Sequence, residues 1–179
     1  MLYDKVLNLC EIPMEVIIFK CLLSLFMVLV IFYDAWKFII PNWVNLVLIL
    51  LYPVACFFLP IDWLNGVITF LAVFAVLLVA YRFNLMGGGD IKYLTVCALW
   101  TGYPLLIQFF IATAISGGIL AVLLLMGRPV MFGFFARAGK IDRLPRIFQA
   151  KEPVPYGIAI SVAILSLIWM DMLFPAVKG

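Results

Sequence analysis

Apolar residues follow one another in long runs along most of this chain, and polar residues gather in short stretches between the runs. The runs are continuous, whereas the strands of a membrane barrel would alternate apolar and polar positions. Segments of about 20 apolar residues cross a bilayer as helices. The sequence therefore predicts helical spans at about residues 14–33, 43–59, 63–83, 91–101, 105–126 and 158–174.

The composition agrees with this pattern, because 68% of the 179 residues are hydrophobic and only 12% are charged. Soluble domains are closer to half apolar and a quarter charged. We expect an all-α, polytopic membrane helix bundle of about six transmembrane helices, forming a single membrane-embedded domain over residues 1–179. Its surroundings are the lipid bilayer, and no nucleic acid is expected as a partner.

Lysine and arginine concentrate in the loops that such a topology places on one side of the membrane. Cationic loops mark the cytoplasmic side of a bilayer. The residues assigned to that side are Lys37, Arg82, Lys92, Arg128, Arg137, Lys140, Arg143, Arg146 and Lys151. Both termini are then outside. Two interpretations of the polar stretch 127–155 stay open: a basic amphipathic helix on anionic lipid, or a solvated cytoplasmic loop.

The predicted topology places two aspartates at the cytoplasmic face. Asp34 ends the first span, and Asp90 opens the fourth. Charged residues at the edge of membrane spans are rare and usually functional. Asp90 follows Gly87, Gly88 and Gly89, which carry no Cβ, so another backbone can come close to this carboxylate. We interpret this glycine segment as the place where a substrate strand lies.

A pair of carboxylates that share one proton can hydrolyse a peptide bond. The ionised group takes a proton from water, and the protonated group donates to the developing oxyanion. Two like charges a few ångströms apart cannot both ionise, which is why such a pair holds a proton. Histidine is absent and the four cysteines form no C-x-x-C pair. We therefore expect no metal and no cofactor.

Each aspartate also has a structural interpretation. Asp90 can serve as the N-cap of the fourth helix, and Asp34 can be a boundary residue paired with Lys37. A noncatalytic transporter or assembly subunit that uses both carboxylates as an ion site is a further alternative. Internal repeats typical of many transporters are not apparent in the sequence.

Three segments together resemble the type IV prepilin peptidases, the bacterial G-x-G-D membrane aspartic proteases. Gly87 to Lys92 resembles the family's G-x-G-D-[VI]-K segment, and Asp34 with Ile40-Pro41-Asn42 resembles its D-x5-I-P-N segment. Residues 154–160, which contain Pro155, Tyr156 and Gly157, resemble the P-[YF]-G-x-A-I start of the last helix. The three segments occur in family order and cover nearly the whole chain.

The resemblance implies that Asp34 and Asp90 are the catalytic aspartates and that the other motif residues shape the site. The implied reaction is removal of a short basic leader from prepilins or pseudopilins, at the cytoplasmic face of the bacterial inner membrane. Cleavage in the family commonly follows a glycine just before the hydrophobic pilin helix. The partners implied are these substrates and the pilus or secretion machinery.

The cysteine pairs and extra cytoplasmic region of the long family form are missing, so the chain resembles the short form of tight-adherence (Flp-type) pilus systems. That form implies protease activity without N-methyl transfer. An archaeal-type preflagellin peptidase is not separated from this interpretation by the sequence. Presenilin-like proteases share the G-x-G-D segment, but they are larger and lack the I-P-N segment.

Overall fold

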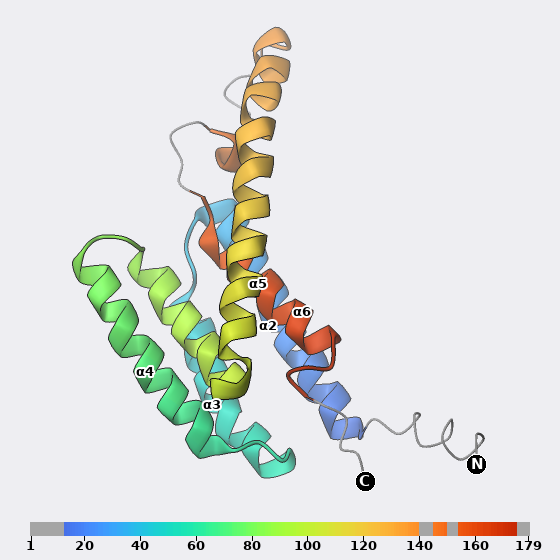
Figure 1. Ribbon diagram of the computed structural model, residues 1–179. Helices are drawn as coiled ribbons and strands as arrows, with labels where there is room; N and C mark the ends of the chain where they lie inside the picture. Colours follow the sequence, from blue (N-terminus) through green and yellow to red (C-terminus); the bar gives the residue numbers. More distant parts are fainter. Residues whose placement is uncertain (1–12, 140–144, 150–153, 175–179) are drawn as a thin grey trace.

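The computed structural model describes residues 13–139, 145–149 and 154–174, and all regular structure within them is helical. Figure 1 shows the chain running back and forth along one main direction, so that consecutive helices are antiparallel. The elements are α2 (Met14–Lys37), α3 (Asn42–Phe58), α4 (Trp63–Arg82), α5 (Gly88–Arg137), the 3-10 turn η2 (Arg146–Phe148) and α6 (Tyr156–Trp169).

Three of these helices, α2, α4 and α5, are long and apolar enough to cross a membrane. The apolar helices α3 and α6 are shorter, at 17 and 14 residues. These helices confirm the expected all-helical membrane protein, whereas the six crossings stay a prediction. The two ends of the chain lie outside the described residues, so the side of the membrane on which they lie also stays a prediction.

Helix α5 has 50 residues, and its backbone leaves the helical conformation at Gly102. The φ angle there is 58°, a left-handed value that favours glycine. Figure 1 shows the chain reversing direction at this bend, so α5 consists of two antiparallel limbs. The bend frees the backbone N–H of Tyr103, which donates to the Asn65 side-chain oxygen at 2.8 Å. The break predicted at residues 102–104 is thus present, and α4 stabilises it.

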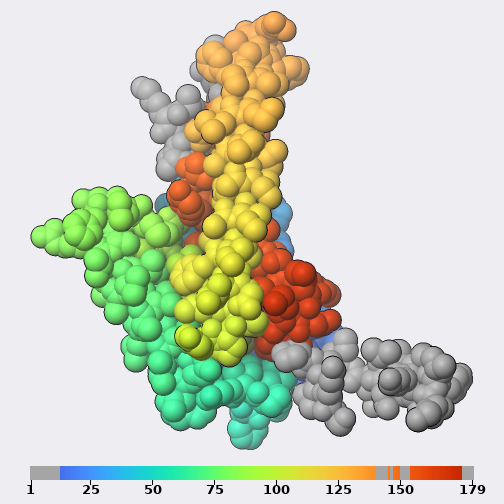
Figure 2. All heavy atoms as spheres, viewed as in Figure 1, coloured from blue at the N-terminus to red at the C-terminus, as the bar shows by residue number. Residues whose placement is uncertain are grey.

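The second limb of α5 extends farther than the sequence predicted, to Arg137 instead of about residue 126. Figure 2 shows it projecting at the top of the view. Pro129 lacks an N–H donor, yet the helix continues past it through a mostly apolar segment. Part of the polar stretch is therefore a continuation of α5. Residues 140–144 and 150–153, on which both interpretations of that stretch also depend, lie outside the described residues.

The last helix ends earlier than predicted, at Trp169, because Asp171 adopts a left-handed φ of 56°. Its carboxylate forms an ion pair with the buried ammonium group of Lys20 in α2. Trp169 also donates its ring N–H to the Ser24 hydroxyl at 3.2 Å. These contacts join α2 and α6 at one end of the molecule.

The opposite end of the molecule gathers the helix ends that carry the predicted site. The C-terminal ends of α2 and α4 and the N-terminal ends of α3, α5 and α6 lie there, near mid-height in Figure 1 and below the projecting limb of α5. Because the helices alternate in direction, segments distant in sequence meet at this end.

Candidate active site

Asp34 lies in the last turn of α2, and only 4% of its surface is exposed. Its carboxylate accepts a hydrogen bond of 3.1 Å from the backbone N–H of Ile158, in the first turn of α6. A helix N-terminus has unpaired N–H groups and a positive dipole end, and both favour an anion. The N-cap residue of α6 is Pro155, whose side chain makes no capping bond. Asp34 therefore supplies from another helix the acceptor that α6 lacks.

Gly157 leaves room for the Asp34 carboxylate. A Cβ at position 157 would lie 2.7 Å from the Asp34 Oδ2 atom and 3.0 Å from the Ile40 side chain. Real Cβ atoms essentially never approach so closely, so the residue before Ile158 has to be glycine for this contact. Tyr156, which the sequence also suggested, has an exposed side chain. The 155–157 segment thus contributes to this contact through its backbone and through the room that Gly157 leaves, and not through the Tyr156 side chain.

Asp90 lies in the first turn of α5, after the N-cap residue Gly87. It is therefore not the N-cap itself, and its side chain is only partly buried. A Cβ at position 87 would lie 3.0 Å from the Asp90 Oδ2 atom, so the carboxylate bends back over this glycine. Gly88 faces the Tyr81 ring, and nothing lies within 4 Å of a Cβ at Gly89. Of the three glycines, Gly87 accommodates the carboxylate and Gly89 borders open space.

The two aspartates lie at the same end of the helix bundle, Asp34 in the last turn of α2 and Asp90 in the first turn of α5. Within the described residues neither carboxylate takes part in an ion pair. The ammonium group of Lys37 lies over the Tyr33 ring, 5.3 Å from its centre, instead of pairing with Asp34. Two carboxylates held a few ångströms apart without a cation between them share a proton. A pair of this kind can supply one proton acceptor and one proton donor.

A buried polar cluster below the aspartates was not predicted from the sequence. The Tyr93 hydroxyl lies 2.7 Å from the Ser161 hydroxyl and donates to the Met27 sulfur at 2.9 Å. These three residues belong to α5, α6 and α2, the helices that carry Asp90, the Ile158 amide and Asp34. The cluster therefore fixes these helices relative to one another. A tyrosine three residues after Asp90, on the same helix face, was the available signal.

The remaining predicted residues lie on another side of α5. Pro41 is the N-cap residue of α3, and Asn42 begins that helix. Asn42 and Lys92 line the same groove between α3, α4 and α5. Lys92 is two residues after Asp90, and side chains at that spacing do not face each other on a helix. The structure thus groups Asn42 with Lys92, separately from the contacts of Asp34.

Comparison with known proteins places the chain in a family. No curated protein and no solved structure gives a significant match to it. The sequence profile of the type IV leader peptidase family, in contrast, matches residues 21–122, which is more than half of the chain and contains both Asp34 and Asp90. The chain belongs to the type IV leader peptidase family, and membership of this family makes it a peptidase.

Proposed function

We propose that this peptidase is a membrane aspartic endopeptidase that removes the leader peptide from prepilin or pseudopilin precursors, with Asp34 and Asp90 as its catalytic pair. The observation that carries the proposal is that these two carboxylates, 56 positions apart in sequence, lie on helix ends at the same end of the bundle, the last turn of α2 and the first turn of α5. The family match supports a leader peptidase over the transporter alternative.

In the proposed reaction a water molecule lies between the two carboxyl groups. The ionised carboxylate accepts a proton from water as the oxygen attacks the scissile carbonyl carbon, and the protonated carboxyl group donates to the carbonyl oxygen. The tetrahedral intermediate then collapses, the C–N bond breaks, and the amine leaves with a proton from the pair. The products are a new carboxyl terminus and a new amino terminus, and no cofactor is consumed.

The proposed site faces the cytoplasm, and the chain crosses the membrane six times when the two limbs of α5 are counted separately. Cationic residues at the site end support this orientation: Lys37, Arg82, Lys92, Arg128 and Arg137. At the other end, Lys20 is neutralised by Asp171. Lysine and arginine concentrate on the cytoplasmic side of membrane proteins.

Open space beside Gly89 supports access of a substrate backbone to Asp90. We expect no N-methyl transfer to the new terminus, as the resemblance to the short form of the family implies. The mature pilin is thus expected to leave the enzyme with an unmodified amino group.

The test is cleavage of candidate prepilins in membranes, read by gel shift and by mass spectrometry of the new N-terminus. Asp34→Asn and Asp90→Asn are each expected to lower the rate about 10²- to 10⁴-fold, the usual contribution of a general acid or base. Asp62→Asn is the matched control, because Asp62 caps α4 and asparagine caps equally well. Absence of processing by the wild type, or full activity of either aspartate variant, would overturn the proposal.

A further inference from the structure

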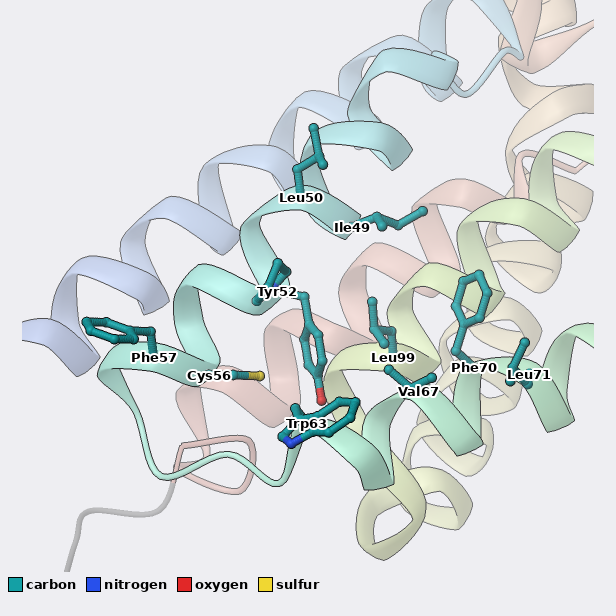
Figure 3. A pocket seen from close by; sticks show the side chains of 11 residues that line it. Ile49, Leu50, Tyr52, Cys56, Phe57, Trp63, Val67, Phe70, Leu71 and Leu99 are labelled. Atoms are coloured by element: carbon teal, nitrogen blue, oxygen red, sulfur yellow. The ribbon is translucent and has the colours of Figure 1, made fainter.

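An apolar groove runs along the molecule between α3 and α4, with the first limb of α5 as its floor. It consists of two cavities of about 650 and 290 Å³ that share Ile49 and Phe70. Figure 3 shows side chains of α3 on one side, side chains of α4 on the other and Leu99 of α5 between them. The groove follows α3 from Asn42 to Phe57, which is about 22 Å at 1.5 Å per residue.

The two ends of this groove differ in chemistry. The larger cavity is lined almost entirely by aromatic and aliphatic side chains. The smaller cavity contains the polar residues Asn42, Asn45, Lys92 and Thr95. Lys92 is two residues from Asp90, so the polar end of the groove is the end beside the candidate active site. A ligand that fits this groove is apolar for most of its length and polar where it approaches Asp90.

Asn45 gives the polar end a specific requirement. Only 6% of its surface is exposed, and neither its amide oxygen nor its amide nitrogen has a hydrogen-bond partner among the described residues. Native proteins pair nearly all buried polar groups. The neighbouring Thr95 hydroxyl, in contrast, donates to the Ile91 carbonyl at 2.8 Å. Rotation of the Asn45 side chain toward the groove would break no hydrogen bond to these residues.

A side-chain amide carries an acceptor and a donor, which is the same pair of groups that a peptide unit presents. Unpaired peptide N–H groups occur in the first turn of a helix, just after an extended segment. A bound segment that changes from extended to helical beside Asn45 could exchange hydrogen bonds with the Asn45 side-chain amide. The apolar helix of that segment would then continue along the groove.

We propose that the groove between α3 and α4 binds the apolar helix that follows the scissile bond of the substrate, and that Asn45 binds the backbone at the start of this helix. This inference rests on the proposed function. The extended segment at the scissile bond then crosses the N-terminus of α5 to reach the aspartates. An apolar segment of about 20 residues is long enough to fill the groove and span the bilayer.

A crosslinking experiment tests the docking site without requiring cleavage. The probe is a synthetic peptide with a short basic leader, a glycine and a 20-residue apolar helix. A photoreactive phenylalanine analogue replaces Leu71, which lines the groove and is 58% exposed, or Val76, an equally accessible control on the same helix at 69%. The protein carries Asp34→Asn and Asp90→Asn, so the probe stays intact.

We expect position 71 to form the adduct, with the modified residue in the apolar part of the probe, and position 76 to form little. Equal yields at the two positions, or adducts with lipid alone at position 71, would overturn the inference. Wild-type cleavage of prepilins without this adduct would refute the docking site and leave the protease proposal intact. Formation of the adduct by a protein whose wild type cleaves no prepilin would support the docking site and refute the protease proposal.

Substitution of Asn45 tests its part in the inference. Asn45→Leu is expected to raise KM for a cleaved prepilin about tenfold, the effect of one lost hydrogen bond, with little change in kcat. The melting temperature should stay the same or rise, because an unpaired buried amide is removed. The matched control Asn65→Leu should lower it, because the Asn65 oxygen accepts from Tyr103. An unchanged KM, or a lower melting temperature for Asn45→Leu, would contradict the role of Asn45.

Discussion

The surroundings of the two aspartates differ although their side chains are chemically identical. Asp34 is buried, held by a backbone amide of α6 and packed against Gly157. Asp90 is partly exposed, and open space lies beside the neighbouring Gly89. A hydrolytic pair needs one group at a fixed position and a path by which the substrate can arrive. In the proposed catalytic pair, α6 provides the fixed position and the glycine turn of α5 provides the path.

The largest expected difference in activity is between alanine substitutions of Gly157, beside Asp34, and of Gly89, beside Asp90. Gly157→Ala places a methyl group 2.7 Å from the Asp34 carboxylate, so Asp34 or α6 must move. Such overpacking typically costs about 1–3 kcal/mol, and a 1 Å displacement of a catalytic group can cost about 100-fold in rate. Prepilin cleavage and thermal unfolding in detergent would measure both losses.

Gly89→Ala is the matched substitution on the Asp90 side. The new methyl group meets nothing within 4 Å, and alanine is the better helix former by about 1 kcal/mol, so the loss of activity should be far smaller. Gly89→Trp should reduce cleavage more than it reduces stability, because the ring fills the path of the substrate. If Gly89→Ala were as damaging as Gly157→Ala, the assignment of the two sides would be wrong.

A comparison of alanine with asparagine at each aspartate isolates the Ile158 hydrogen bond. Asparagine keeps an oxygen acceptor, whereas Asp34→Ala leaves the Ile158 N–H without one. Leaving a buried donor unpaired costs about 1–3 kcal/mol. The Ala variant should therefore be less stable than the Asn variant by this amount at position 34. At position 90 the two should agree within about 0.7 kcal/mol, the spread of helix propensity, in thermal unfolding.

Tyr93→Phe tests the cluster that joins the three helices. The substitution removes the hydroxyl that contacts Ser161 and Met27. We expect a loss of about 1 kcal/mol in the free energy of unfolding. Ser161→Ala in the Tyr93→Phe background should cost little more, because the partner is already lost. Additive losses in this double-mutant cycle would show that the two hydroxyls act independently.

Lys37→Ala has the smallest expected effect. The lysine lies over the Tyr33 ring and is not paired with Asp34. An exposed cation–π contact contributes about 0.5–1 kcal/mol, and the activity of prepilin cleavage should change no more than about twofold. A loss comparable with that of Asp34→Asn would restore the boundary ion pair as the role of Asp34.

The sequence predicted the helices well because long apolar runs report burial in lipid or in the bundle directly. Gly102 marked the bend, and the alternation of spans indicated that Asp34 and Asp90 share one end. The partners of each side chain were not predictable in this way. The contact of Asp34 with α6 depends on the angle at which α2 and α6 pack, and the pairing of Tyr93 with Ser161 depends on the angle between α5 and α6. The end of the fifth span was also predicted too early, at about residue 126, since α5 continues to Arg137.

The hydrogen bond between Asp34 and Ile158 has a consequence for biogenesis, because its two residues are 124 positions apart. A ribosome that adds about 5–20 residues per second needs roughly 6 to 25 s to travel this distance. For the last 68 of these positions, roughly 3 to 14 s, the nascent chain already contains both aspartates and the glycine turn, but α6 is not complete. Proteolytic competence is therefore expected to arise late in synthesis, after the final helix has packed beside α2, and truncated products of translation would carry both carboxylates without it.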